Sequence, residues 1–190
     1  NSFIKNFQNS NFLIQGSCGI GKSSFSIINS REFFNKIPKN NILKIDALED
    51  SKISILKKRL KYFIDSKFSL FDHRRLIVID NSDRLSFSNQ LNLREKMEKI
   101  DKGLHFWLIC QSLIKINPTI ISRCLTLNFR PSSAINLGIR MHEISEKERF
   151  FCHFETLLNS IFIGNGDIRK SINSLFQKKL VLKNNFFPTL

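Results

Sequence analysis

The sequence has no long hydrophobic run, and this excludes a membrane-spanning helix. The apolar stretches of the 190 residues are short, as at Leu76 to Ile79, whereas a span needs about 20 consecutive apolar residues. No secretory signal opens the chain, because Lys5 and the polar run from Asn6 to Asn11 interrupt any apolar segment there. We therefore expect no membrane partner, and we interpret the initial Asn1 as a sign of a fragment or a trimmed product.

Cysteine is scarce, which argues against a disulfide-stapled or zinc-binding domain. The four cysteines are Cys18, Cys110, Cys124 and Cys152. None of them forms a C-x-x-C pair, and no histidine lies at a spacing that would complete a zinc cluster. Reduced thiols in a nucleus or a cytosol are the better interpretation.

Acidic residues are few as well, so the chain carries a formal net charge of +14. This excess favours a polyanion or an acidic partner, with nucleic acid as the first candidate. The alternative is lysine enrichment by codon bias in an AT-rich genome, which would also account for the 19 phenylalanines. Hydrophobic residues make up 42% of the chain, enough to build a core, so general disorder is excluded.

Five short apolar runs, each the length of a buried strand, recur along the first two thirds of the chain. They cover residues 12–15, 42–45, 76–80, 106–110 and 125–129. Between them, residues 22–34 and 53–64 place apolar side chains at helical spacing. Strands that alternate with helices predict an α/β fold whose parallel sheet is covered on both faces.

The strand pattern stops after Phe129. Arg130 to Ser133 is typical of a linker that ends in a helix N-cap. Residues 134–144, 149–162 and 167–180 then predict three helices. We therefore expect an α/β core over residues 1–130 and a small helical domain over residues 131–190.

A phosphate-binding loop follows the first expected strand. The sequence GSCGIGKS matches G-x-x-x-x-G-K-[ST] and directly precedes the first expected helix. Backbone N–H groups of such a loop hold phosphate oxygens, Lys22 reaches the β- and γ-phosphates, and the Ser23 hydroxyl coordinates Mg²⁺. The alternative is a glycine-rich turn without a ligand. The expected nucleotide-binding residues are Gly16, Ser17, Cys18, Gly19, Ile20, Gly21, Lys22, Ser23 and Ser24.

A carboxylate closes the third expected strand. Asp80 would lie at the C-terminal edge of the sheet, where ligands bind in such folds, and would bind Mg²⁺ together with Ser23. The alternative is a helix N-cap. An ATPase of this design usually carries a glutamate next, but here the residue is Asn81, which can orient a water and cannot accept its proton. ATP binding should survive this change, whereas fast hydrolysis should not. Asp83 is the alternative base, but its displaced position argues against this role.

The order of these motifs resembles that of the AAA+ ATPases, and most of all that of the small subunits of replication factor C, the sliding-clamp loader. The similar segments are residues 41–63, QLNLREKMEK at 90–99, FWLICQSLIKINPTIISRC at 106–124 and GDIRKSIN at 166–173. The resemblance implies a five-stranded parallel sheet flanked by helices and followed by a small helical lid. It also implies ATP and Mg²⁺ as cofactors.

The resemblance assigns further site residues one at a time. Arg123 matches the arginine finger that reaches the ATP of a neighbouring subunit, with a surface arginine as the alternative. Arg169 matches the sensor-2 arginine, which contacts the γ-phosphate of the chain's own nucleotide. Gln111 occupies the sensor-1 position, where the family has asparagine. Lys52, Lys57 and Lys61 lie on the expected DNA-facing side of a helix, with a solvated face as the alternative.

The resemblance also implies partners: other clamp-loader subunits in a hetero-pentamer, a ring-shaped sliding clamp, and primer–template DNA held by backbone contacts, in a nucleus. The family's segment before the loop and its C-terminal collar find no counterpart in this sequence, so we expect either a fragment or an unusually reduced subunit. Two alternatives stay open. One is a nucleotide-bound structural subunit that hydrolyses little, which Asn81 and Gln111 favour; the other is a different AAA+ DNA-processing ATPase.

Overall fold

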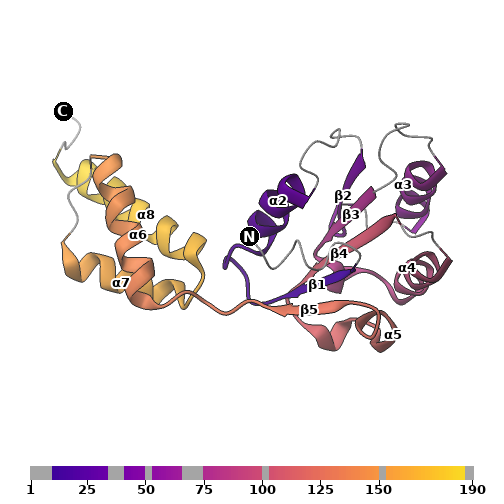
Figure 1. Ribbon diagram of the computed structural model, residues 1–190. Coiled ribbons are helices and arrows are strands. Elements are labelled where there is room, and N and C mark those ends of the chain that lie inside the picture. Colours follow the sequence, from indigo (N-terminus) through magenta and orange to yellow (C-terminus); the bar gives the residue numbers. More distant parts are fainter. Residues whose placement is uncertain are drawn as a thin grey trace. The chain divides into compact units, whose positions relative to one another are not determined.

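The computed structural model describes residues 10–33, 41–49, 53–65, 75–99, 103–149 and 153–186, and the statements below concern these residues. The chain divides into two compact units (Figure 1). The first consists of residues 1–16 and 21–129, and the second of residues 17–20 and 130–190.

The first unit is built on a five-stranded parallel sheet in the order β2-β3-β4-β1-β5. The strands are β1 (Phe12–Gln15), β2 (Ile42–Asp46), β3 (Arg75–Asp80), β4 (Leu104–Cys110) and β5 (Leu125–Asn128). All five fall on the apolar runs of the sequence, so the predicted α/β fold is confirmed. β4 is buried along its whole length, as expected for a central strand covered on both faces.

Helices cover both faces of this sheet (Figure 1). They are α2 (Lys22–Phe33), α3 (Ile53–Asp65), α4 (Phe87–Lys99) and the short α5 (Pro118–Ile121), with 3₁₀ turns η2 (Ser82–Arg84) and η3 (Leu113–Lys115). Because successive strand side chains point to opposite faces, the core has two layers. Leu13 and Ile77 pack with Leu56 and Leu93 of α3 and α4.

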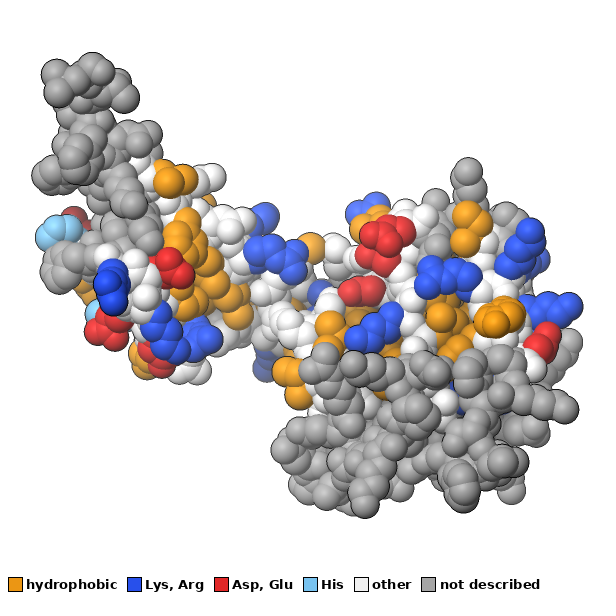
Figure 2. All heavy atoms as spheres, turned by 90° about the horizontal axis from the view of Figure 1, so that it is seen from above, with side chains coloured by type: hydrophobic (Ala, Val, Ile, Leu, Met, Phe, Trp, Pro, Cys, Tyr) orange, Lys and Arg blue, Asp and Glu red, His pale blue; other side chains and the backbone are white. Residues whose placement is uncertain are grey.

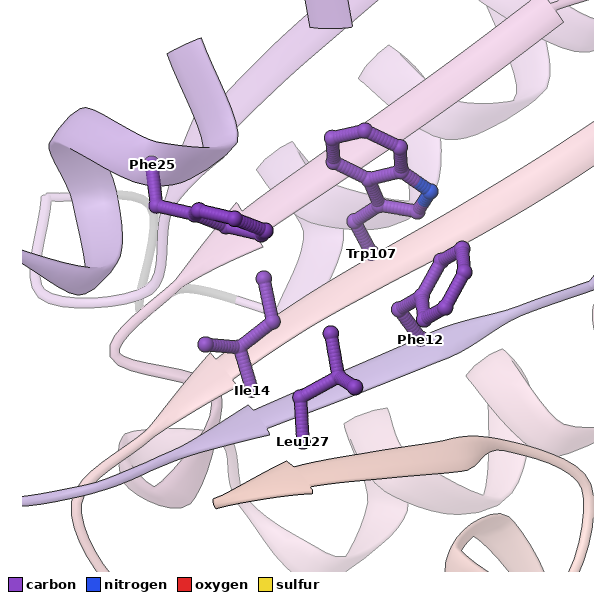
Figure 3. A pocket seen from close by; sticks show the side chains of 5 residues that line it. All are labelled: Phe12, Ile14, Phe25, Trp107 and Leu127. Atoms are coloured by element: carbon purple, nitrogen blue, oxygen red, sulfur yellow. The ribbon is translucent and has the colours of Figure 1, made fainter. Parts of the chain in front are cut away.

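On the other face, α2 packs through Phe25. Figure 3 shows this side chain directed toward Ile14 and Trp107, while Phe12 lies next to Trp107 and farther from Phe25. The Phe12 and Trp107 rings meet edge to face, with centroids 5.7 Å apart and planes at 88°. Phe25 also makes an edge contact with Phe129, at 5.0 Å between centroids. These aromatic contacts hold the first turn of α2, and with it the end of the phosphate-binding loop, against β1.

The second unit contains three described helices: α6 (Ala134–Lys147), α7 (Phe154–Gly164) and α8 (Ile168–Phe186). Its core consists of Leu137, Met141, Leu157 and Leu175. The prediction that a helix begins at Arg149 is wrong. Arg149 has a φ of 50° and donates its backbone N–H to Glu146, so it closes the end of α6, and α7 begins at Phe154.

Hydrophobic side chains gather on the surface of the second unit (Figure 2). They include Ile135 and Ile139 of α6 and Phe154 of α7, and a groove of about 470 Å³ lies among them. Within the described part of the chain, no helix combines the length and the apolar character that a membrane crossing requires.

Candidate nucleotide-binding site

Three strand ends bring the candidate site together at one edge of the sheet. β3 ends at Asp80, β4 ends at Cys110, and β1 is followed directly by Gly16. The strands are parallel, so their carboxyl ends share this edge, where ligands bind in such folds. The backbone N–H of Gly16 donates to the carbonyl of Cys110 at 3.3 Å, which holds the beginning of the loop against β4.

Lys22, the first residue of α2, bends back over the loop. Its Nζ donates to the carbonyl oxygen of Gly16 at 2.7 Å, and only 8% of the residue is exposed. Gly21 has a φ of 92°, a left-handed conformation that glycine adopts without strain. The ammonium thus lies beside the carbonyl of Gly16, near the N-terminus of α2, which is the kind of position where a phosphate binds.

Residues 17–20 of the loop belong to the second unit. There the backbone N–H of Ile168 donates to the carbonyl of Gly19 at 3.3 Å. Gly19 has a φ of 68°, and a Cβ at this position would collide with the carboxylate of Asp167, so another residue would need a left-handed backbone and a shift of Asp167. Cys18 is exposed.

The oxygen atoms of Ser23 and Asp80 suit a magnesium ion. Mg²⁺ in nucleotide sites is held by one or two protein oxygens, phosphate oxygens and water. Ser23 lies in the first turn of α2, and Asp80 is a half-buried carboxylate at the end of β3. A hydroxyl and a carboxylate fit an ion that takes its other ligands from phosphate and water. Among the described residues, no group of three or more His, Cys, Asp or Glu could hold a metal by itself.

Asn81 is held by carboxylates on both sides. Its backbone N–H donates to Oδ1 of Asp80 at 2.9 Å, and its Nδ2 donates to Oδ1 of Asp46 at 3.0 Å. Asp46 was not predicted as a site residue. Part of the signal was present in the sequence, because Asp46 closes an apolar strand as Asp80 does. The register that pairs the two residues across β2 and β3 is visible only in the structure.

Asp83, the displaced carboxylate after Asn81, is buried. Its Oδ1 accepts a hydrogen bond from the backbone N–H of Gln111 at 3.4 Å, so it holds the predicted sensor-1 position next to the end of β4. Burial, and after it the negative charge of Asp83, raises the pKa of Cys110 to about 11, although Lys22 acts in the opposite direction. The Gln111 residue itself is exposed.

Arg123 is held in a defined position on the surface. Its Nη2 pairs with Oε1 of Glu98 at 2.6 Å, and its Nη1 donates to the carbonyl oxygen of Thr119 at 2.6 Å. With 38% of its side chain exposed, Arg123 can still be reached from outside the chain. Its role as a finger toward a neighbouring subunit stays a prediction.

The remaining predicted residues lie on two helices. Lys57 and Lys61 are exposed on α3, and Lys52 lies outside the described residues. Arg169 is exposed in the first turn of α8, in the second unit. Contacts of these residues with DNA or nucleotide stay predictions.

Known structures that are similar to this one define the class of the fold. A RuvB mutant from Thermotoga maritima has a TM-score of 0.73 at 14% sequence identity, and the match covers 94% of this chain and 57% of that one. A DNA polymerase III gamma subunit-related protein from the same organism has a TM-score of 0.62 at 14% identity, with 92% and 56% covered. The fold is that of the AAA+ P-loop ATPases.

Sequence comparison gives a narrower similarity. The chain is 32% identical to a replication factor C small subunit of Picrophilus torridus over 172 residues, which are 90% of this chain and 54% of that protein. It is 30% identical to a putative replication factor C small subunit of Acanthamoeba polyphaga mimivirus, with 95% and 54% covered. The predicted resemblance to replication factor C small subunits is confirmed. The chain spans about half the length of these relatives, and no protein-family model matches it.

Proposed function

We propose that the chain is the ATP-binding part of a clamp-loader subunit that acts in DNA replication. The observation that carries this proposal is the loop between β1 and α2, where the buried Lys22 ammonium lies 2.7 Å from the carbonyl of Gly16. Lys22 would bind the β- and γ-phosphates, while Ser23 and Asp80 would hold Mg²⁺. The similarity to replication factor C small subunits supports the place in replication.

The other predicted residues complete this function. Arg169 would contact the γ-phosphate of the same nucleotide, and Gln111 would orient the attacking water. Arg123 would reach the ATP of a neighbouring subunit in a hetero-pentamer, where its charge would stabilise the transferring phosphoryl group. The complex would act on a ring-shaped sliding clamp and on primer–template DNA, in a nucleus.

A second function is a nucleotide-bound subunit that hydrolyses little and serves as finger donor. Asn81 favours it, because an amide cannot take a proton from the attacking water. In both functions the loop binds ATP, so they differ in turnover and not in binding.

Calorimetric titration with ATP·Mg²⁺ tests the proposal. Lys22→Ala removes a charge-assisted contact to phosphate, so we expect affinity to fall about 10- to 100-fold. Lys115→Ala, which changes an exposed lysine on η3, is the matched control and should bind like the wild type. Equal affinities of the Lys22→Ala variant and the wild type would contradict the proposal.

A further inference from the structure

The hydrogen bond between Asn81 and Asp46 determines which atom of the Asn81 amide, the oxygen or the nitrogen, remains available for another hydrogen bond. An ionised carboxylate only accepts hydrogen bonds, so the amide nitrogen must face it. The nitrogen of Asn81 therefore points to Oδ1 of Asp46, at 3.0 Å, and the amide oxygen points away. In the described part of the chain, no residue donates a hydrogen bond to that oxygen.

The carboxylate of Asp46 is itself held firmly. Its Oδ1 also accepts the backbone N–H of Leu48 at 2.9 Å, in a turn directly after β2. The next residue, Ala47, donates its N–H to the carbonyl of Asp80 at 3.1 Å and extends the pairing of β2 with β3. These bonds favour the observed position of the Asp46 carboxylate, beside residue 81.

We propose that Asp46 is a positioning residue for ATP hydrolysis at this site. It holds Asn81 with the amide oxygen available to accept a hydrogen bond from the attacking water, and it disfavours a carboxylate at position 81. The second effect follows from charge, because two carboxylates at hydrogen-bond distance repel each other unless one of them is protonated. This inference rests on the proposed function.

Single-turnover hydrolysis of ATP by the full chain tests this proposal. In the Asp46→Asn variant, Asn81 faces an amide that both donates and accepts hydrogen bonds, so the Asn81 amide is no longer held in one orientation. We expect the slow hydrolysis of ATP to fall several-fold, while the affinity for ATP stays unchanged. Asn81→Glu alone should gain little. Combining Asn81→Glu with Asp46→Asn removes the repulsion and supplies a base, and the rate should rise about 10²-fold above that of Asn81→Glu alone.

Thermal unfolding adds a readout that does not depend on turnover. We expect Asn81→Glu to lower the unfolding midpoint at neutral pH, and Asp46→Asn to recover part of that loss in the double variant. Asp65→Asn, a change of an exposed residue at the end of α3, is the matched control. Combined with Asn81→Glu, it should not restore the unfolding midpoint.

The outcomes separate this inference from the proposed function. If Asn81→Glu alone hydrolyses ATP as fast as its combination with Asp46→Asn, Asp46 does not control position 81 and the inference is wrong. The same follows if Asp65→Asn rescues as well as Asp46→Asn. If the wild-type chain binds no ATP·Mg²⁺, the proposed function itself fails.

Discussion

At residue 81 the backbone is left-handed, with a φ of 52°. Asparagine enters this region far more readily than most side chains, because its short amide makes local hydrogen bonds. A glutamate there would be strained in addition to meeting Asp46. The Asn81→Glu variant and its double with Asp46→Asn share this strain, so the difference between their rates reports the carboxylate pair alone.

Cysteine reactivity offers a second test at the level of single residues. Burial raises the pKa of Cys110 to about 11 and that of Cys124 to about 12, so at pH 8 only about one thiol in 10³ or fewer is ionised at these sites. Cys18 is exposed in the loop, so iodoacetamide should modify it first. ATP·Mg²⁺ should slow this labelling at least tenfold.

Labelling is best measured in a Cys152→Ser background, which removes the thiol that lies outside the described residues. In the Lys22→Ala variant, ATP should give little protection at the same concentration. Labelling of Cys18 at one rate with and without nucleotide would show that ATP does not bind at this loop.

Among the elements, the strands could be predicted from the sequence because each is a short apolar run with polar residues at its ends. The loop was predictable for a similar reason, since its glycines and Lys22 stand at fixed spacing between a strand and a helix. The beginning of α7 was not, because a left-handed Arg149 stops α6 without a glycine or proline to indicate it. Asp46 was missed because strand order, which pairs it with Asp80, cannot be read from the chain.

Helix α3 carries a test of DNA binding. Lys57 and Lys61 are exposed on it, and each phosphate contact that is lost should flatten the dependence of log affinity on log salt by about 0.9. Reversing both charges should therefore reduce the slope by about two units, and adding Lys52 by up to three, when duplex binding by the assembled complex is titrated at several salt concentrations.

Reversal of Lys115 and Lys147 is the matched control, because both are exposed elsewhere on the chain and carry the same charge. If this control flattens the slope as much as the change on α3, the binding reflects the net charge of +14 and no particular face.

At the scale of the whole molecule, the proposed function gives the chain two roles that need different partners. The loop with the buried Lys22 would bind a nucleotide within the chain, whereas Arg123, which lies exposed on the surface, would act only if a second subunit presented its ATP. Asn81 would weaken the first role and leave the second untouched. We therefore propose a subunit that contributes more to its neighbour's hydrolysis than to its own.

The ATPase rate of the assembled complex tests this claim most directly. Arg123→Ala removes positive charge from the transition state of a competent site, where a finger contributes about 10³-fold or more, while Lys22→Ala silences a site that already lacks its base. Size-exclusion chromatography must first show that both variants assemble, with Lys115→Ala as the control. We predict that Arg123→Ala lowers the rate more than Lys22→Ala. A larger loss with Lys22→Ala in intact complexes would show that the chain is an active ATPase in its own right and would contradict the account.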